Sequence, residues 1–213
     1  MREYLPRAGD AGTRATRWAD LGDDVMTEQI PEILILDGRP YDVCGIRGGD
    51  RLFDLRDHGI TPIALTSECC RGFISTYLVA DGILYLDEIE VGLDPREPTG
   101  RDHVLLSTLL GDSRLNGSST PGHYENLEYP IAFTGGLLLG HGLIKEPYVC
   151  MGFHPAYTYR EIVELGLDEG RVVTRVDRSA ELDQLRKKIV CGDRNGAGPL
   201  PDWIERGFDF EYS

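Results

Sequence analysis

The stretch at residues 73–91 reads FISTYLVADGILYLDEIEV. Two apolar runs, rich in β-branched and aromatic residues, flank the dipeptide Asp81-Gly82. Because Asp-Gly readily adopts the left-handed dihedrals of a two-residue turn, this pattern predicts a β-hairpin. Alternation along the second strand predicts two faces, with Ile83, Tyr85, Ile89 and Val91 on one and Leu84, Leu86, Glu88 and Glu90 on the other. We expect this hairpin to be the central antiparallel pair of the fold.

Three more hairpins are predicted on either side of this stretch. The first has its turn at Asp37-Gly38, between strands Glu32–Leu36 and Arg39–Cys44. The second has its turn at Gly135-Gly136, between strands Tyr129–Thr134 and Leu137–Leu139. The third has its turn at Glu169-Gly170, between strands Tyr159–Leu167 and Arg171–Val176. A single strand is expected at Ile60–Leu65, where Pro62 favours an edge or entry position. For His103–Leu110, periodicity leaves a short helix and a strand equally open.

One amphipathic helix is predicted near the C-terminus, at Ala180–Val190. Ser179 can cap it, Leu182, Leu185 and Ile189 form an apolar stripe, Asp183 and Lys187 can pair, and Gly192 can end it. Successive hairpins without a βαβ rhythm, followed by one C-terminal amphipathic helix, indicate an α+β fold that is mainly antiparallel β.

The chain is expected to form one domain with two tails. Residues 1–25 are polar and poor in large apolar side chains, so they predict a flexible extension. Residues 26–192 predict a single β-rich domain. Residues 193–213 predict a tail that docks through aromatic side chains, among them Trp203 and Phe208.

Composition excludes several classes of partner. The net charge is −14 and the pI is about 4.7, so a nucleic acid or an anionic membrane surface would be repelled and a basic partner attracted. There is no apolar run of membrane-spanning length and no hydrophobic core of a secretory signal. Five cysteines without framework spacing favour a reducing compartment, and we expect a cytoplasmic protein.

Three sequence segments resemble a group of bacterial hypothetical proteins. They are Cys69-Cys70-Arg71-Gly72-Phe73, Leu84-Tyr85-Leu86, and Tyr148-Val149-Cys150-Met151-Gly152-Phe153. The group has an aromatic residue at the position of Cys70 and histidine at the position of Cys150. The resemblance implies a β-rich fold and a bacterial origin, and it implies no activity because none is known for the group.

Arg71 is the first candidate for a functional side chain. Its fork of donors suits a carboxylate or phosphate; the structural alternative is an ion pair with Glu68, Glu88 or Glu161, or exposure at a strand end. Adjacent Cys69 and Cys70 should point to opposite faces. In an enzyme, Cys70 or His154 would be the catalytic group beside Arg71; otherwise the cysteines are small buried hydrophobes and His154 is a loop histidine.

Three aromatic loop residues, together with Arg71, are the candidates for ligand binding. They are His123, Tyr124 and Tyr157. Glu88 and Glu90 should share a strand face, where paired carboxylates can do metal or acid–base work but are typical of a solvated face. The histidines and cysteines match no zinc spacing, and phosphate-loop motifs are missing. We therefore expect neither a metal nor a cofactor.

These observations lead to two hypotheses from different classes. The first is a cytoplasmic bacterial protein that recognises a partner protein, of basic surface, or a small ligand, as an immunity or accessory protein does. The second is a small enzyme with an anion-binding pocket centred on Arg71 and with Cys70 or His154 as its catalytic group. Homodimerisation through an exposed hairpin edge is compatible with both.

Overall fold

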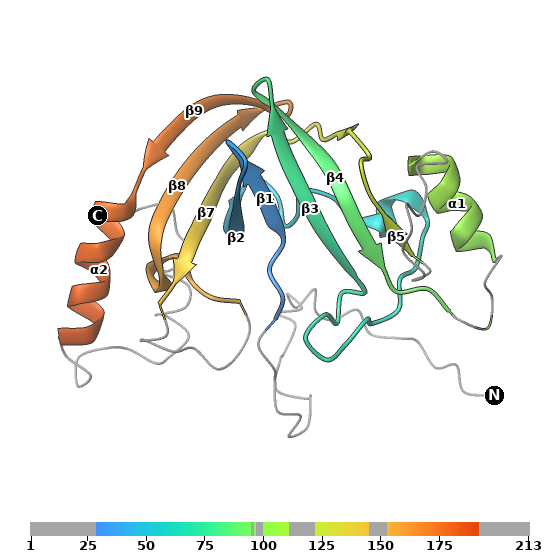
Figure 1. Ribbon diagram of the computed structural model, residues 1–213, viewed down its shortest axis with the longest axis horizontal. Helices are drawn as coiled ribbons and strands as arrows, with labels where there is room; N and C mark the ends of the chain where they lie inside the picture. The colour runs from blue at the N-terminus through green and yellow to red at the C-terminus, as the bar shows by residue number, and fades with distance from the viewer. Residues whose placement is uncertain (1–28, 95, 97–99, 111–121, 145–152, 192–213) are drawn as a thin grey trace, which may run out of the picture.

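The computed structural model describes residues 29–94, 96, 100–110, 122–144 and 153–191 (Figure 1). The predicted N-terminal extension, the aromatic tail and Cys150 lie outside these residues. Within them the fold is mostly β-sheet with mixed and antiparallel pairing, in agreement with the broad α+β prediction. No described helix has the length and apolar character needed to cross a membrane.

In the described part of the chain, nine strands form one sheet that closes on itself. They are β1 (Ile33–Leu36), β2 (Arg39–Arg47), β3 (Phe73–Ala80), β4 (Ile83–Val91), β5 (His123–Tyr124), β6 (Tyr129–Pro130), β7 (Gly135–Leu143), β8 (Tyr159–Asp168) and β9 (Arg171–Asp177). The order is β3-β1-β2-β7-β8-β9-β4-β5, with β6 on β4 and a second pairing of β3 with β4. β9 pairs with β4 at a single residue pair, Ile83 with Arg171, so the pairing between these two strands is short.

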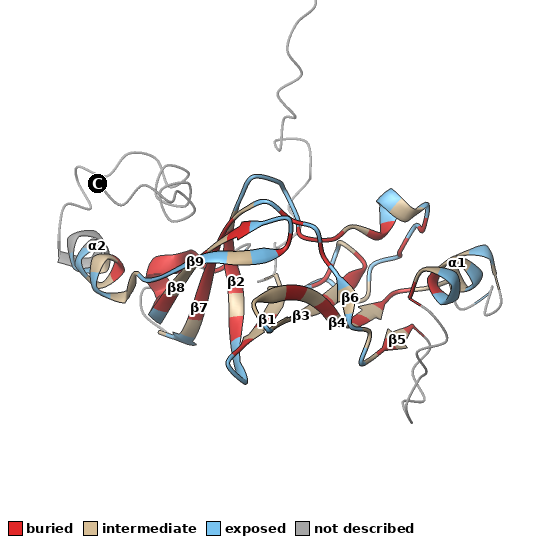
Figure 2. Ribbon diagram, turned by 90° about the horizontal axis from the view of Figure 1, so that it is seen from above, coloured by how far each residue is buried: buried red, intermediate tan, exposed pale blue. Residues whose placement is uncertain are grey.

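The closed end of the sheet lies where two hairpins meet. In Figure 1 the β3–β4 and β8–β9 hairpins converge near the top and the strands spread apart below them, so that the sheet resembles a tent. The backbone N–H groups of Leu84 and Val172 donate to Gly170 O and Gly82 O, which joins the two turns. Figure 2 shows β7 and β8 largely buried and β9 largely exposed.

Three of the four predicted hairpins are confirmed. The first residue of each turn, Asp37, Asp81 or Glu169, has φ between 47° and 52°, and a glycine with φ of 74° to 80° follows it. The hairpin predicted at Gly135-Gly136 is wrong, because these glycines are the first residues of β7, which pairs with β2 and β8. A Cβ at Gly135 would lie 2.0 Å from the Arg47 carbonyl oxygen. Glycine there permits close approach of two backbones rather than a turn.

A β-bulge in β4 overturns the predicted strict alternation. Thr76 pairs with Glu88 and Tyr77 with Leu86, so Asp87 is the extra residue. The buried positions therefore change from Leu84 and Leu86 before the bulge to Ile89 and Val91 after it. Glu88 and Glu90 still share a face and are half-buried.

The segments that connect the strands differ in part from the prediction. Ile60–Leu65 is not a strand: it follows the 3₁₀ helix η2 (Leu55–His58) as an extended segment, and the Ile63 N–H donates to Gly92 O. The open choice at His103–Leu110 resolves as helix, in α1 (Arg101–Leu110). A second 3₁₀ helix, η3 (Ala156–Thr158), leads into β8.

The C-terminal helix α2 (Ser179–Cys191) begins differently from the prediction. The cap is not the Ser179 hydroxyl, which donates to Asp177; the Asp177 carboxylate instead accepts the first helical N–H, from Ser179, at 2.9 Å. The ion pair of Asp183 with Lys187 is confirmed at 2.7 Å. Leu182 is buried, but the remaining apolar side chains of the stripe fall outside the description, so the amphipathic character stays a prediction.

The hydrophobic core occupies both faces of the sheet. Leu137 and Leu139 belong to the main cluster, with residues of every strand from β1 to β4 and with Leu106 of α1. Leu138, which points the other way, packs with Leu182 of α2 in a second cluster. α2 thus covers the outer face of β7 and β8 (Figure 1). The polar site described next is formed by residues at β1, β3 and η2.

Candidate functional site

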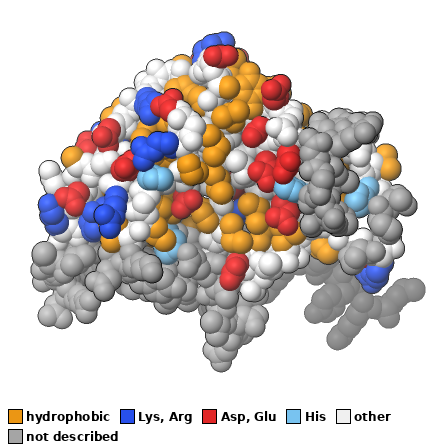
Figure 3. All heavy atoms as spheres, viewed as in Figure 1, with side chains coloured by type: hydrophobic (Ala, Val, Ile, Leu, Met, Phe, Trp, Pro, Cys, Tyr) orange, Lys and Arg blue, Asp and Glu red, His pale blue; other side chains and the backbone are white. Residues whose placement is uncertain are grey.

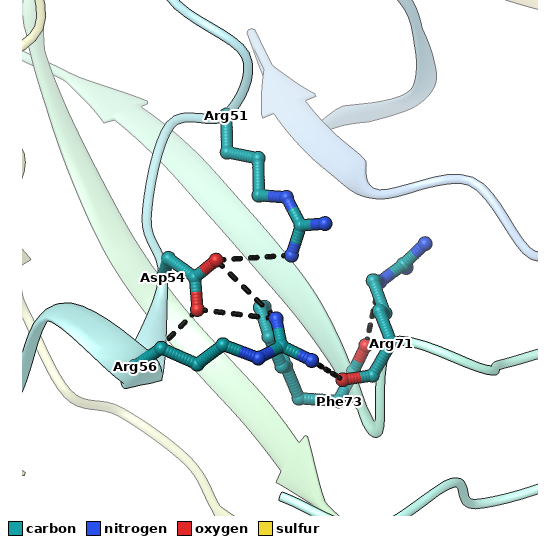
Figure 4. A network of polar contacts seen from close by, with 5 residues as sticks. All are labelled: Arg51, Asp54, Arg56, Arg71 and Phe73. Atoms are coloured by element: carbon teal, nitrogen blue, oxygen red, sulfur yellow. Dashed lines mark hydrogen bonds and ion pairs between the residues drawn. The ribbon is translucent and has the colours of Figure 1, made fainter. Parts of the chain in front are cut away.

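One carboxylate gathers two arginines at the start of η2. Asp54 precedes this helix, and its side chain accepts the backbone N–H of Arg56 at 2.9 Å. The same carboxylate pairs with Arg51 at 3.0 Å and with the Arg56 guanidinium at 3.4 Å (Figure 4). The local helix start therefore positions the Asp54 carboxylate, because an aspartate here satisfies a free N–H group of the first turn, and both guanidinium groups pair with that carboxylate.

Arg71 joins this group from the segment before β3. Its Nε donates to Phe73 O at 2.6 Å and its Nη1 to Ile30 O at 2.8 Å. The Arg56 guanidinium donates to the carbonyl of Arg71 at 3.2 Å (Figure 4). We refer to Arg51, Arg56 and Arg71, with Asp54, as the arginine cluster.

The predicted acid partners of Arg71 do not pair with it among the described residues. Glu88 pairs with His123, and Glu161 with Arg39. Glu68 forms no ion pair within the described ranges. The acid beside Arg71 is instead Glu32, which lies just before β1 and is 9% exposed.

Burial dominates the electrostatics of Glu32. Removal from water raises the pKa of this carboxyl, against the opposing attraction of Arg71 and the contact with the Tyr77 hydroxyl. Burial likewise raises the pKa of Tyr77 well above its ordinary value, and the charge of Glu32 adds to the rise. Burial of Glu32 therefore opposes the ionised form of the carboxyl that would pair with the Arg71 guanidinium.

Three buried polar atoms lie near Glu32 and form no hydrogen bond of good geometry with a described residue. They are Arg71 Nη2, Ser75 Oγ and the Tyr77 hydroxyl. Ser75 and Tyr77 alternate along β3 on its core face, and both are fully buried. The contact with the Tyr77 hydroxyl lowers the pKa of Glu32, and Ser75 and Arg71 both lower the pKa of Tyr77, so the three atoms belong to one group.

The cluster reaches solvent through its arginines. The side chains of Arg51 and Arg56 are 40% and 46% exposed. The Phe153 ring covers the Arg71 guanidinium, with 5.9 Å between the guanidinium carbon and the ring centroid. Phe153 itself is 39% exposed, so the Arg71 guanidinium lies beneath a ring that faces solvent.

The three predicted catalytic residues have different neighbours. Cys70 is exposed, and its thiol donates to Ser67 O at 3.3 Å, whereas Cys69 is buried; both lie in a turn before β3, so the strand alternation expected for them does not apply. His154 is buried and its ring meets the ring of Tyr159 edge-on, at 6.5 Å. Tyr159 donates to Asp42 at 2.9 Å. Burial raises the pKa of Asp42, against the effects of Tyr159 and His154.

Two of the predicted ligand-binding tyrosines pack within the protein. Tyr124 and Tyr157 are buried, and burial raises the pKa of each hydroxyl. The Tyr157 carbonyl accepts a hydrogen bond from Arg186 of α2 at 2.7 Å. His123 instead lies between carboxylates at the β4–β5 pair, 2.6 Å from Glu88 and 3.6 Å from Glu125.

Sequence reasoning found Arg71 and missed the rest of its surroundings. The signal for Glu32 was present, because it is an acid directly before the apolar run of β1. Ser75 and Tyr77 alternate with Phe73 along β3, but nothing local in the sequence marks them as polar partners of Arg71.

Comparison with known proteins found no matching family model, no matching curated protein and no matching solved structure. The expected recognition of a basic partner protein stays a prediction, as does the cytoplasmic location.

Proposed function

We propose that this chain is a ligand-binding protein whose arginine cluster takes a small anion, either a carboxylate or an oxoanion of the sulfate and phosphate type. The observation that carries the proposal is the meeting of Arg71 Nη2, Ser75 Oγ and the Tyr77 hydroxyl, all buried and without a well-formed hydrogen bond to described residues. Leaving one such group unsatisfied costs about 1–3 kcal/mol. Groups that retain this cost are concentrated at functional sites.

The chemistry of the group suits an anion. Arg71 offers the N–H groups of Nη2, since Nε and Nη1 donate to backbone carbonyls, and the two hydroxyls can donate to oxygen atoms of the same ligand. Arg51 and Arg56 add positive charge near the surface, where Asp54 neutralises only part of it. In a chain of net charge −14, such a locally basic group is the place where an anion would be held.

Binding is favoured over catalysis because the candidate catalytic groups lie with other partners. The Cys70 thiol faces Ser67 O, and His154 lies against Tyr159. A nucleophile or base has to reach the reacting atom of a ligand held by Arg71. The enzyme hypothesis with Cys70 or His154 therefore ranks second.

The test is a calorimetric titration of the purified full chain with sulfate, inorganic phosphate and succinate. The variants are Arg51→Met and Arg71→Lys, and Arg96→Met is the control because Arg96 is exposed and pairs only locally with Asp94. A lost charge-assisted hydrogen bond is worth about 1.5–3 kcal/mol, so we expect roughly 10- to 100-fold weaker binding in Arg51→Met and Arg71→Lys. Arg96→Met should bind as the wild type does.

Two outcomes would contradict the proposal. One is no saturable binding of any of the three anions by the wild-type chain. The other is an equal loss in Arg51→Met and Arg96→Met, which would indicate diffuse attraction by surface charge. Sulfate does not titrate between pH 5 and 8, so it also tests the role of Glu32: binding should strengthen towards pH 5, because a protonated Glu32 does not compete for Arg71.

A further inference from the structure

A second group of side chains, separate from the arginine cluster, converges at the pairing of β4 with β5. His123 Nε2 lies 2.6 Å from Glu88 Oε1 and 3.6 Å from Glu125 Oε1. One donor atom from each of the three residues lies within 4.8 Å of the other two. We infer that Glu88, His123 and Glu125 form a binding site for a divalent transition-metal ion.

The ligand spacing fits a metal ion. Bonds of about 2.0–2.2 Å from zinc to imidazole nitrogen or carboxylate oxygen place neighbouring donors roughly 3–3.5 Å apart. The measured separations bracket this range, so small side-chain rotations bring all three donors to one ion. The three side chains are partly exposed, at 20% for His123, 41% for Glu88 and 39% for Glu125, so an ion can enter from solvent.

The backbone arrangement holds the ligands together. Glu90 is the register partner of His123, and the bulge at Asp87 displaces the residues of β4 before that pair. The Leu127 N–H donates to Asp87 O at 2.9 Å, which ties the segment after β5 to the bulge. Bulges commonly re-aim side chains beside functional sites, and here the bulge lies next to Glu88.

The charge at this place is not balanced within the described part of the chain. Glu88 and Glu125 both lie against His123, and no Lys or Arg of the described residues forms an ion pair with either carboxylate. Ion pairs elsewhere in the described residues match a carboxylate with a guanidinium or an ammonium group. In Figure 3 acidic side chains gather with a histidine over the β4–β5 side of the molecule. A divalent cation would offset this charge.

The donor set selects the class of metal. An imidazole nitrogen with two carboxylate oxygens suits Zn²⁺ or Mn²⁺, whereas Mg²⁺ and Ca²⁺ prefer oxygen ligands alone. Three protein ligands leave coordination positions for water or a further ligand, which is the pattern of open rather than purely structural sites.

The test uses Mn²⁺, since thiolates of the five cysteines bind it weakly, followed by electron paramagnetic resonance of the free ion. The full chain is first treated with a chelator and dialysed. The variants are His123→Gln and Glu125→Gln, and Glu90→Gln is the control because it removes the same charge from β4 outside the ligand group. Circular dichroism confirms that each variant is folded; Glu125 follows β5, so its replacement leaves the strand pairing in place.

We expect one Mn²⁺ per chain, at least tenfold weaker binding in His123→Gln and Glu125→Gln, and a change of less than twofold in Glu90→Gln. Calorimetry with Zn²⁺ should follow the same order. Equal weakening in Glu90→Gln and Glu125→Gln would overturn the inference, because it would reveal nonspecific attraction by the acidic surface. No saturable Mn²⁺ or Zn²⁺ binding by the wild-type chain would overturn it as well.

Discussion

Two buried tyrosines provide a matched test of the arginine cluster. Tyr77 and Tyr159 are 0% and 1% exposed, so Tyr→Phe removes one buried oxygen in each case. The Tyr159 hydroxyl donates to the half-buried Asp42 carboxylate at 2.9 Å, and its removal should lower the free energy of unfolding by about 1–3 kcal/mol. The Tyr77 hydroxyl closes no well-formed hydrogen bond with a described residue. Its removal should leave the free energy of unfolding unchanged or raise it by up to about 1 kcal/mol.

Urea unfolding followed by circular dichroism measures both variants against the wild type at constant m-value. For a chain of this size, 1 kcal/mol corresponds to a shift of about 2–4 °C in the melting temperature, so calorimetry gives a second reading. Tyr77→Phe should also weaken sulfate binding, because the hydroxyl is lost as a donor. A gain in stability with a loss of binding is typical of a residue kept for function.

The result that refutes this reasoning is a loss of stability in Tyr77→Phe as large as in Tyr159→Phe. It would mean that the Tyr77 hydroxyl contributes to the folded state as a normal hydrogen-bonding group. The polar atoms beside Glu32 would then be structural, and the proposed anion site would lose its main support.

Three further predictions concern stability. Burial raises the pKa of Glu32 above 4.5, so the folded chain holds a proton that the unfolded chain releases, and stability falls as pH rises from about 4.5 to the raised pKa. Glu32→Gln has no proton to release, so its unfolding free energy should increase relative to that of the wild type as pH rises. A difference in unfolding free energy that stays the same in urea titrations at pH 4.5, 5.5 and 6.5 would contradict this. Gly140→Ala would place a Cβ 2.5 Å from the Tyr159 ring and should cost about 1–3 kcal/mol by overpacking, measured as a lower urea midpoint. Asp177→Ala removes the carboxylate that accepts the Ser179 N–H and should cost about 1 kcal/mol; an unchanged melting temperature would count against the cap.

Sequence reasoning located Arg71 but not the meaning of its position. Donors at the start of an apolar strand are visible in the sequence, whereas one of the acceptors of Arg71, Ile30 O, is 41 residues away. The same holds for His123, whose closest carboxylate belongs to a residue 35 positions earlier. Such partners depend on which strands become neighbours, and single-sequence patterns contain no direct record of strand order.

The hairpins were determined by the sequence itself, because an Asp-Gly or Glu-Gly pair between apolar runs dictates its own left-handed turn. The tertiary structure alone decided where that local rule fails. Gly135-Gly136 opens a strand, because β2 approaches its backbone too closely for a side chain. Asp87 becomes a bulge, because β3 and β4 have to keep apolar residues inward at both ends. Pairing of β1 with β3 brings Glu32 to Arg71, and pairing of β4 with β5 brings His123 to Glu88, since contacts between distant segments form only when the whole chain packs.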